Sequence, residues 1–429
     1  MARIIGLSFS KLFKCLITDN LTYILVEQHS RNSIREKTCP IFDSLWRKET
    51  VEYKIPSKSF CSDYCPLFPK PYWFQCDRGI MPEIKYFYGK ERSCSVNSGD
   101  GVKDAINEKC MNKIATFFTK SDKDQNTIVY ITSGFGFGNY DWLPDLKDSI
   151  FNKYGEGNII VGIIYWDSGS KGVKSGSLRN THKPFHENTK WAICCIPSVS
   201  FIPNYGVASV NTWPIGNIVA YINEKISKTS SGSTFRTFCI GNSLGAHLCG
   251  FFGKMSQQLD PSLRIDKIIG LDPASPIWEY DDQNPRLRLN KDDAKEVEIF
   301  HTNSNKIGFQ NPIGNIDFYI NGGSSQPGCT FNNDILEIVG SCSHLMAKTF
   351  LIHLNNNNNS CFASWKCNIT DGSKLAHIED EDVSSLNSNN CFPDQKITVG
   401  DLDSLKGINK GVYWVDMDKE SKTCYFDGY

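Results

Sequence analysis

The sequence predicts an α/β fold in which helices cover both faces of a mostly parallel sheet. Two runs, 127–132 and 159–166, are almost wholly apolar and rich in β-branched residues, as in strands that are buried on both faces. A segment with helical spacing, Leu143 to Tyr154, separates them. This order of strand, helix and strand is that of a parallel unit, and a chain of 429 residues can bury the large core that such a sheet needs.

Further elements follow the same alternation. Periodicity predicts strands at 83–88, 237–240, 265–271 and 296–303, and helices at 102–118, 143–154, 207–226, 244–252 and 345–354. The stretch 167–205 is polar and shows no clear element, so we expect an insertion there, which is functional or disordered. Residues 1–75 bear cysteines and lack clear periodicity, and we expect an extension there, followed by one domain over 76–429.

The composition excludes several classes of partner. Apolar residues make up 40% of the chain and the formal net charge is −1, which leaves no electrostatic footprint for nucleic acid or an anionic membrane. No run of 18 apolar residues occurs, so we expect no transmembrane anchor. The oligomeric state is left open.

Seventeen widely spread cysteines, without a repeated metal-binding spacing, indicate disulfides and an oxidising compartment. Glycosylation sequons begin at Asn20, Asn358 and Asn368. We therefore expect a secreted protein, although Lys11 and Lys14 interrupt the first 18 residues and leave no clean signal-peptide core.

A candidate nucleophile lies in Gly241-Asn242-Ser243-Leu244-Gly245, a G-x-S-x-G turn between an apolar strand and an apolar helix. A turn this tight strains the backbone, and the two glycines remove the side chains that would clash. Ser243 would then stand at the tip as a nucleophile. The alternative is a serine in an ordinary glycine-rich turn.

A candidate acid, Asp272, follows the next strand in Gly270-Leu271-Asp272-Pro273-Ala274-Ser275-Pro276. Reacting groups gather beyond the carboxyl ends of parallel strands, which places Asp272 and Ser243 at the same edge. An aspartate before proline is also a common way to begin a turn, and this is the alternative interpretation.

Four histidines follow Asp272 and are candidates for the base in the order Ser, Asp, His: His301, His344, His353 and His377. We favour His344, because Cys342 could hold its loop and a helix is expected to begin directly after it. His301, at the end of a strand, is the second choice. His247, four residues after Ser243, is expected to be structural.

These blocks together resemble the neutral, pancreatic-type lipase family, which includes arthropod phospholipases A1 and lipase-like yolk proteins. The resemblance runs from about Cys76 to the end, because several blocks occur in the family's order: Gly134-Phe135, Tyr165-Trp166-Asp167 with two residues exchanged, 240–253, 270–276, 300–303, 314–323 and 326–329. It implies an α/β-hydrolase fold, with Ser243 as nucleophile, Asp272 as acid and His344 as base. The backbone N–H groups of Phe135 and Leu244 would form the oxyanion hole. Such a triad needs no metal or cofactor, and none is expected.

The chain departs from the family pattern in three places. Asn242 replaces the histidine that usually precedes the nucleophile, and 167–205 is longer than the family's connection. The sequence up to Tyr429 leaves no room for the carboxyl-terminal β-sandwich of vertebrate pancreatic enzymes, so colipase-type anchoring is not expected.

The resemblance also implies a lid at 330–341 between Cys329 and Cys342, which would form a disulfide. Its apolar residues would line either a packed hairpin or a flap that opens at a lipid surface; they are Phe331, Ile335, Leu336, Ile338 and Val339. In the family a short lid accompanies phospholipase A1 activity, which favours a phospholipid over a triacylglycerol substrate.

The sequence thus predicts a secreted serine ester hydrolase that cleaves acyl esters of lipids at an interface. Two alternatives remain. One is a catalytically silent binding or storage protein of the same fold, which would not need to retain the triad. The other is a soluble carboxylesterase that acts on small, short-chain esters.

Overall fold

The computed structural model describes residues 82–97, 108–119, 126–135, 140–157, 159–166, 198–230, 235–275, 278–279, 285–304, 306–329, 341–357, 362–369, 391–394, 399–402 and 410–417. The expected extension 1–75, its boundary at 76, and 167–197 of the expected insertion lie outside these residues.

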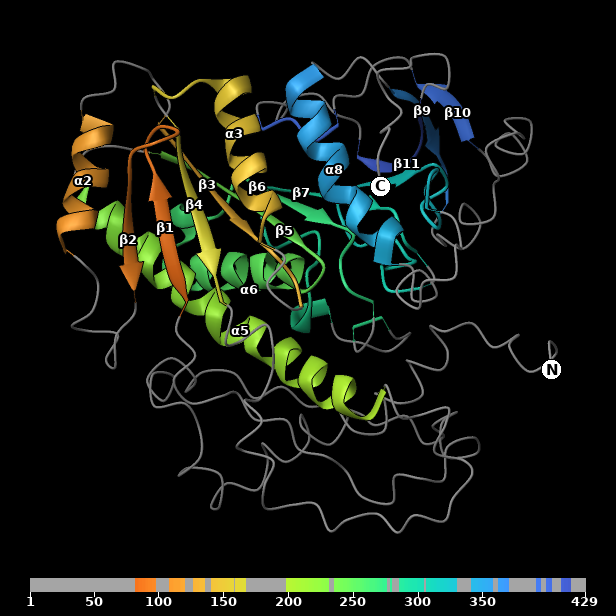
Figure 1. The fold of residues 1–429 in the computed structure, drawn as a ribbon, viewed down its shortest axis with the longest axis horizontal. Helices are drawn as coiled ribbons and strands as arrows, with labels where there is room; N and C mark the ends of the chain where they lie inside the picture. The colour runs from red at the N-terminus through yellow and green to blue at the C-terminus, as the bar shows by residue number, and fades with distance from the viewer. Residues whose placement is uncertain are drawn as a thin grey trace, which may run out of the picture.

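The centre of the molecule is an 11-stranded sheet in the order β10-β9-β11-β8-β7-β6-β5-β3-β4-β1-β2 (Figure 1). Neighbouring strands from β4 to β11 in that order run parallel, and antiparallel pairs close both edges. The strands are β1 (Glu83–Phe87), β2 (Ser93–Asn97), β3 (Asn126–Thr132), β4 (Ile159–Tyr165), β5 (Phe235–Asn242), β6 (Lys267–Leu271), β7 (Glu296–His301), β8 (Ile316–Ile320), β9 (Phe362–Cys367), β10 (Cys391–Asp394) and β11 (Gly411–Met417).

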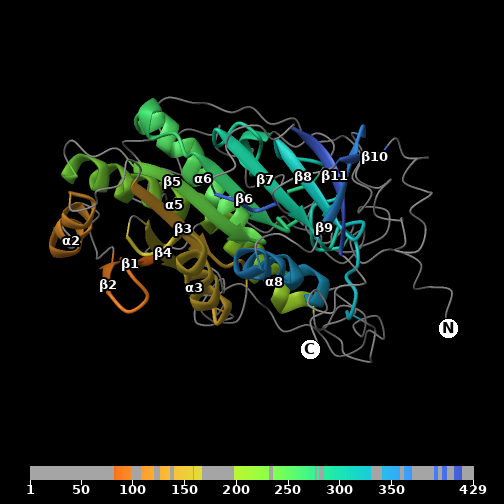
Figure 2. The ribbon, with the colours of Figure 1, turned by 90° about the horizontal axis from the view of Figure 1, so that it is seen from above.

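Helices cover both faces of the sheet, as Figure 2 shows from above. On one face α2 (Glu108–Thr119), α5 (Ser198–Thr229) and α6 (Leu244–Leu259) pack on one apolar core; on the other, α3 (Trp142–Tyr154) and α8 (Ser341–Asn357) pack on a second. The alternation of strand side chains divides the two cores: Ile128 and Tyr130 of β3 enter the first, and Val129 and Ile131 enter the second. The predicted α/β fold is confirmed.

Two predictions about elements were wrong. Helix α5 begins at Ser198, so the end of the expected featureless stretch 167–205 is helical. Helix α8 begins at Ser341 and not after His344, so His344 lies in its first turn. Strands β2, β8, β9, β10 and β11 were not foreseen.

A buried charge cluster lies at the amino ends of the central strands. The Lys267 ammonium in β6 contacts the carboxylates of Glu296 at 2.8 Å and Glu298 at 3.1 Å, both in β7. Glu298 also accepts a hydrogen bond from the Gly400 amide, so the cluster fixes a distant loop to the sheet. Among the described helices, none is long and apolar enough to cross a membrane.

Candidate active site

Ser243 occupies the turn between β5 and α6. Its φ of 58° is positive, which is unusual for a residue other than glycine. A Cβ at Gly241 would overlap the carbonyl of Gly245, and a Cβ at Gly245 would lie 2.7 Å from the Ser133 carbonyl oxygen. Both positions therefore exclude a side chain. The Ser243 amide donates to the Leu271 carbonyl at 3.0 Å, which ties the nucleophile's backbone to the neighbouring strand β6.

A disulfide spans the same turn. Cys239 in β5 and Cys249 in α6 are fully buried and are bonded to each other across a sequence separation of 10. The bond joins the strand before Ser243 to the helix after it. The two arms of the turn are therefore covalently fixed.

Asp272 follows β6 directly and lies beside Ser243, since Asn242 and Leu271 are register partners. It is fully buried and has a φ of 44°. Its Oδ1 accepts two backbone N–H bonds, from Thr302 at 2.8 Å and from Asn303 at 3.0 Å. These bonds hold the carboxylate in place and leave Oδ2 for another partner.

That partner is His344. Its Nδ1 lies 2.5 Å from Oδ2 of Asp272, so the carboxylate fixes the ring orientation and favours a proton on Nδ1. Nε2 is then free to accept a proton. Within the described residues the imidazole hydrogen-bonds to Asp272 and not to the Ser243 hydroxyl.

The loop after β3 lies directly over Ser243. A Cβ at Gly134 would come within 2.5 Å of the Ser243 Cβ and 3.0 Å of its Oγ. The Trp166 indole donates to the Ser133 carbonyl at 3.0 Å and holds this loop, while the Phe135 ring packs edge-on against Tyr205.

Two amides are predicted for the oxyanion hole: that of Leu244, which follows Ser243 in the chain, and that of Phe135, which is in the loop over Ser243. Phe135 follows the glycine that lies against Ser243. Leu244 opens helix α6, and the first amides of a helix have no partner within it. The assignment of these two amides to an oxyanion hole stays a prediction.

His247 is structural, as expected. It is fully buried, donates from Nε2 to the Ala274 carbonyl at 2.8 Å and accepts at Nδ1 from the Leu289 amide at 3.2 Å. Burial lowers the pKa of His247 to about 3. The ring is therefore neutral and fully occupied by its two bonds.

His301, the second choice for the base, forms its hydrogen bonds with residues other than Ser243. Its ring nitrogens contact the Phe309 carbonyl and the Asp317 carboxylate, each at 2.9 Å. His353 lies on α8, and His377 lies outside the described residues.

Cys329 and Cys342 form a disulfide, and Cys342 lies in the first turn of α8 with His344. The proposed lid residues lie outside the described residues; they are Phe331, Ile335, Leu336, Ile338 and Val339.

Three further features hold the site, and of these Gly308 was not singled out from the sequence. The buried Asn242 donates from Nδ2 to the Leu271 carbonyl at 2.9 Å, so this replacement for histidine supports the turn. A Cβ at Gly308 would overlap both carboxylate oxygens of Asp272. The backbone amides of Thr302 and Asn303 carry no side-chain signature, although the 300–303 block had marked the segment.

Comparison with known proteins identifies the family. The profile described as Lipase matches residues 185–396, which contain Ser243, Asp272 and His344. "Phospholipase A1" of Vespula squamosa is 32% identical over 234 residues, covering 54% of this chain and 70% of that protein. "Phospholipase A1 1" of Polistes dominula is 27% identical over 352 residues, covering 82% and 89%, and "Phospholipase A1 1" of Dolichovespula maculata is 40% identical over 144 residues, covering 33% and 42%. This chain belongs to the lipase family.

Proposed function

We propose that this protein is a serine ester hydrolase that cleaves acyl esters of lipids through an acyl-enzyme on Ser243. The observation that supports this most directly is the bond between Asp272 and His344 beside the strained Ser243 turn. Proteins that only bind lipid have no need of this arrangement. Its retention therefore favours an enzyme over a silent storage protein.

The first half of the reaction forms the acyl-enzyme. The Ser243 hydroxyl attacks the ester carbonyl while Nε2 of His344 takes its proton, and Asp272 stabilises the resulting imidazolium. The carbonyl oxygen becomes an oxyanion that accepts bonds from the Phe135 and Leu244 amides. One such donor lowers the activation free energy by on the order of 3 kcal/mol. The tetrahedral species collapses as His344 protonates the leaving alcohol.

The second half releases the acid. Water enters the site, His344 takes one of its protons, and the resulting hydroxide attacks the acyl carbonyl. Collapse breaks the bond to Ser243 Oγ, which recovers its proton from His344. The products are a fatty acid and the deacylated alcohol, and the enzyme returns to its starting state.

We propose a phospholipid, cleaved at its sn-1 ester, as the substrate, with triacylglycerol as the alternative. Similarity to proteins named phospholipase A1 supports this choice, as does the short interval between Cys329 and Cys342. We also propose secretion, which the disulfides Cys94–Cys110, Cys239–Cys249, Cys329–Cys342 and Cys367–Cys391 support.

The test compares the native protein with Ser243→Ala on phospholipid vesicles, emulsified triacylglycerol and a dissolved short-chain ester. We expect the variant to remain folded and to lose at least about 1,000-fold in kcat. Equal turnover by both proteins would reject the enzymatic proposal. A preference for triacylglycerol would reject the phospholipase assignment, and full activity on the dissolved ester without lipid would favour the soluble esterase.

A further inference from the structure

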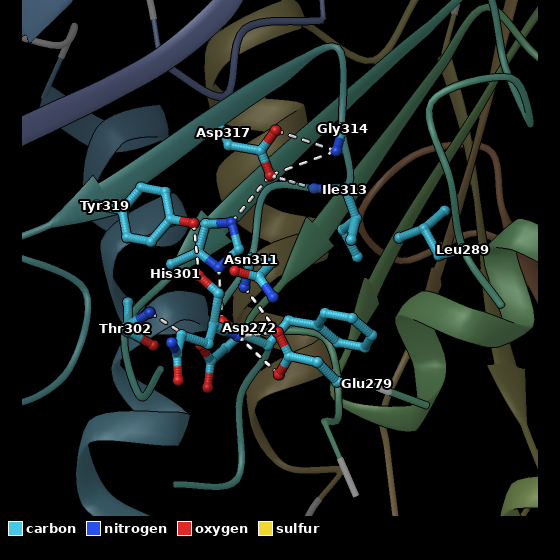
Figure 3. A network of polar contacts seen from close by, with 12 residues as sticks. Asp272, Glu279, Leu289, His301, Thr302, Asn311, Ile313, Gly314, Asp317 and Tyr319 are labelled. Atoms are coloured by element: carbon cyan, nitrogen blue, oxygen red, sulfur yellow. Dashed lines mark hydrogen bonds and ion pairs between the residues drawn. The ribbon is translucent and has the colours of Figure 1, made fainter. Parts of the chain in front are cut away.

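A second histidine and carboxylate pair lies near Asp272, above it in the view of Figure 3. His301, at the end of β7, and Asp317, in β8, are both buried, and Nε2 of the ring lies 2.9 Å from Oδ1 of the carboxylate. The His301 ring stacks on Tyr319 with ring centroids 4.2 Å apart. The Asp317 carboxylate also accepts from the backbone amides of Ile313 and Gly314. The orientation of the ring is thus set from two sides.

Both ring nitrogens of His301 face acceptors. Nδ1 lies 2.9 Å from the Phe309 carbonyl oxygen, and a carbonyl can only accept. The carboxylate of Asp317 also accepts, so both nitrogens are satisfied when the ring is an imidazolium. Burial disfavours this charge, but the bond to Asp317 and its negative charge outweigh burial and raise the pKa of His301.

The His301 ring closes a loop around Asp272. The residues after His301, Thr302 and Asn303, donate their amides to Asp272. At the other end, Gly308 packs against the same carboxylate, and the next carbonyl, that of Phe309, is bonded to the His301 ring. One side chain therefore joins the two ends of the segment that surrounds Asp272.

Asp272 needs such support. Its positive φ is a conformation that costs on the order of 1 to 3 kcal/mol for a residue other than glycine. It persists only where surrounding contacts determine it. Those contacts include the bond from the Asp272 amide to the Phe300 carbonyl, the bond to His344, the two loop amides and Gly308. A small displacement of this loop would move Asp272 and, through it, the His344 ring.

We propose that the His301–Asp317 pair is a positioning element for the reaction: it holds the 302–309 loop so that Asp272 orients His344. The inference rests on the proposed function. His301 and Asp317 touch no reacting atom, so they act on the chemical step and not on substrate affinity.

The test uses Asp317→Asn and His301→Gln, with Tyr319→Phe as a milder change that retains the stacked ring and removes its hydroxyl bond to Gln310. For the first two we expect kcat to fall at least tenfold while KM changes less than twofold. For Tyr319→Phe we expect a loss of two- to fivefold. Circular dichroism and thermal unfolding establish which variants are folded at the assay temperature.

The matched control is Glu298→Gln. It disrupts a buried ion pair of the same sheet, but at the opposite ends of the strands. We expect a lower unfolding temperature and an unchanged kcat. Folded variants of the pair that retain native kcat would overturn the inference, as would an equal loss in Glu298→Gln.

Native protein and Ser243→Ala are measured in the same series. If these two turn over substrate equally, the proposed function fails. If Ser243→Ala is inactive and the His301 and Asp317 variants retain native kcat, the positioning role alone fails.

A separate observation concerns the β10 edge of the sheet. Asn368, which begins the sequon Asn368-Ile369-Thr370, directly follows β9 and is exposed. It lines an open pocket of about 450 Å³ together with Phe392 of the edge strand β10. The Phe392 side chain is 62% exposed, the largest exposed apolar side chain of the described residues. Such a side chain on a sheet edge exposes apolar surface to association.

We infer that Asn368 carries an N-linked glycan whose first sugars cover Phe392 and occupy this pocket. The attached group is bulky and solubilising, and the apolar face of a sugar ring matches an exposed aromatic ring. The inference requires passage through a secretory pathway, as the disulfides indicate, and is independent of catalysis.

The test is glycopeptide mass spectrometry of protein secreted from insect cells, with Asn368→Gln and Phe392→Ser as variants. We expect a glycan at Asn368. We also expect that glycosidase-treated protein and the Asn368→Gln variant aggregate more readily than native protein. Phe392→Ser should suppress that difference. An unmodified Asn368 in the secreted protein would overturn the site, and equal solubility with and without the glycan would overturn the covering of Phe392.

Discussion

Asp272 and His344, 72 positions apart in the chain, are joined by a hydrogen bond of 2.5 Å between Oδ2 and Nδ1. The other carboxylate oxygen is occupied by two backbone amides. Oδ1 of the carboxylate is therefore held by the backbone, and Oδ2 is bonded to the imidazole.

Replacing Asp272 by Asn should abolish most of the activity. The amide can donate to Nδ1 of His344, which moves the imidazole proton to Nε2 and leaves no acceptor for the Ser243 proton. We expect kcat to fall about 10,000-fold with the fold retained. Initial rates and thermal unfolding check this. Asp266→Asn, just before the same strand, is the control and should retain kcat; an equal loss there would contradict the prediction.

Gly134→Ala should displace the loop that carries Phe135. The new Cβ would lie 2.5 Å from the Ser243 Cβ, so the loop must move away from the nucleophile. A displacement of about 1 Å at a reacting centre costs on the order of 100-fold in rate, and we expect a loss of that size in kcat. The control is Gly157→Ala, where a Cβ meets nothing within 4 Å. Native kcat in Gly134→Ala would refute the placement of the loop.

Gly308→Ala should displace Asp272, because the added methyl group would overlap both of its carboxylate oxygens. We expect at least a tenfold loss of kcat, little change in KM and a lower unfolding temperature. Steady-state kinetics on folded protein measure the effect, again against Gly157→Ala. An active variant with native kcat would show that the loop yields without moving the carboxylate.

His247 should make stability depend on pH. Its pKa is about 3 in the folded protein and near its usual 6.5 when unfolded, so the unfolded chain binds a proton in this window that the folded protein does not. Its contribution is full above pH 6.5 and is lost as pH falls towards 3, by about 3 kcal/mol between pH 7 and pH 4.

Urea unfolding of native protein and His247→Gln at pH 7 and pH 4 measures this difference. The variant should show the smaller loss of unfolding free energy on acidification, because it lacks the titrating ring. Other groups, such as the buried Asp293, titrate in both proteins and cancel. Equal losses in the two proteins would contradict the prediction.

Much of the fold and the candidate site was predictable because the signals were local. The composition of apolar strands such as 127–132 and 159–166 predicts them directly. Ser243 and Asp272 each follow a parallel strand, and the carboxyl ends of neighbouring parallel strands lie at the same edge of the sheet. Helix α5 was predicted too short, because Pro203 and Gly206 commonly end a helix, whereas this helix continues through both positions.

The support of Asp272 was not predictable in the same way. It depends on backbone amides at Thr302 and Asn303 and on the missing side chain of Gly308, and none of these has a pattern that identifies its partner. The start of α8 was misplaced because Ser341 and Cys342 precede the apolar periodicity that marks the rest of the helix.

The Cys239–Cys249 bond has a consequence for biosynthesis. A chain that is still in a reducing compartment lacks this crosslink, so the two arms around the reactive hydroxyl are free to part. Disulfides form in oxidising compartments such as the ER lumen, so the turn around Ser243 gains this crosslink only where the chain meets such a compartment.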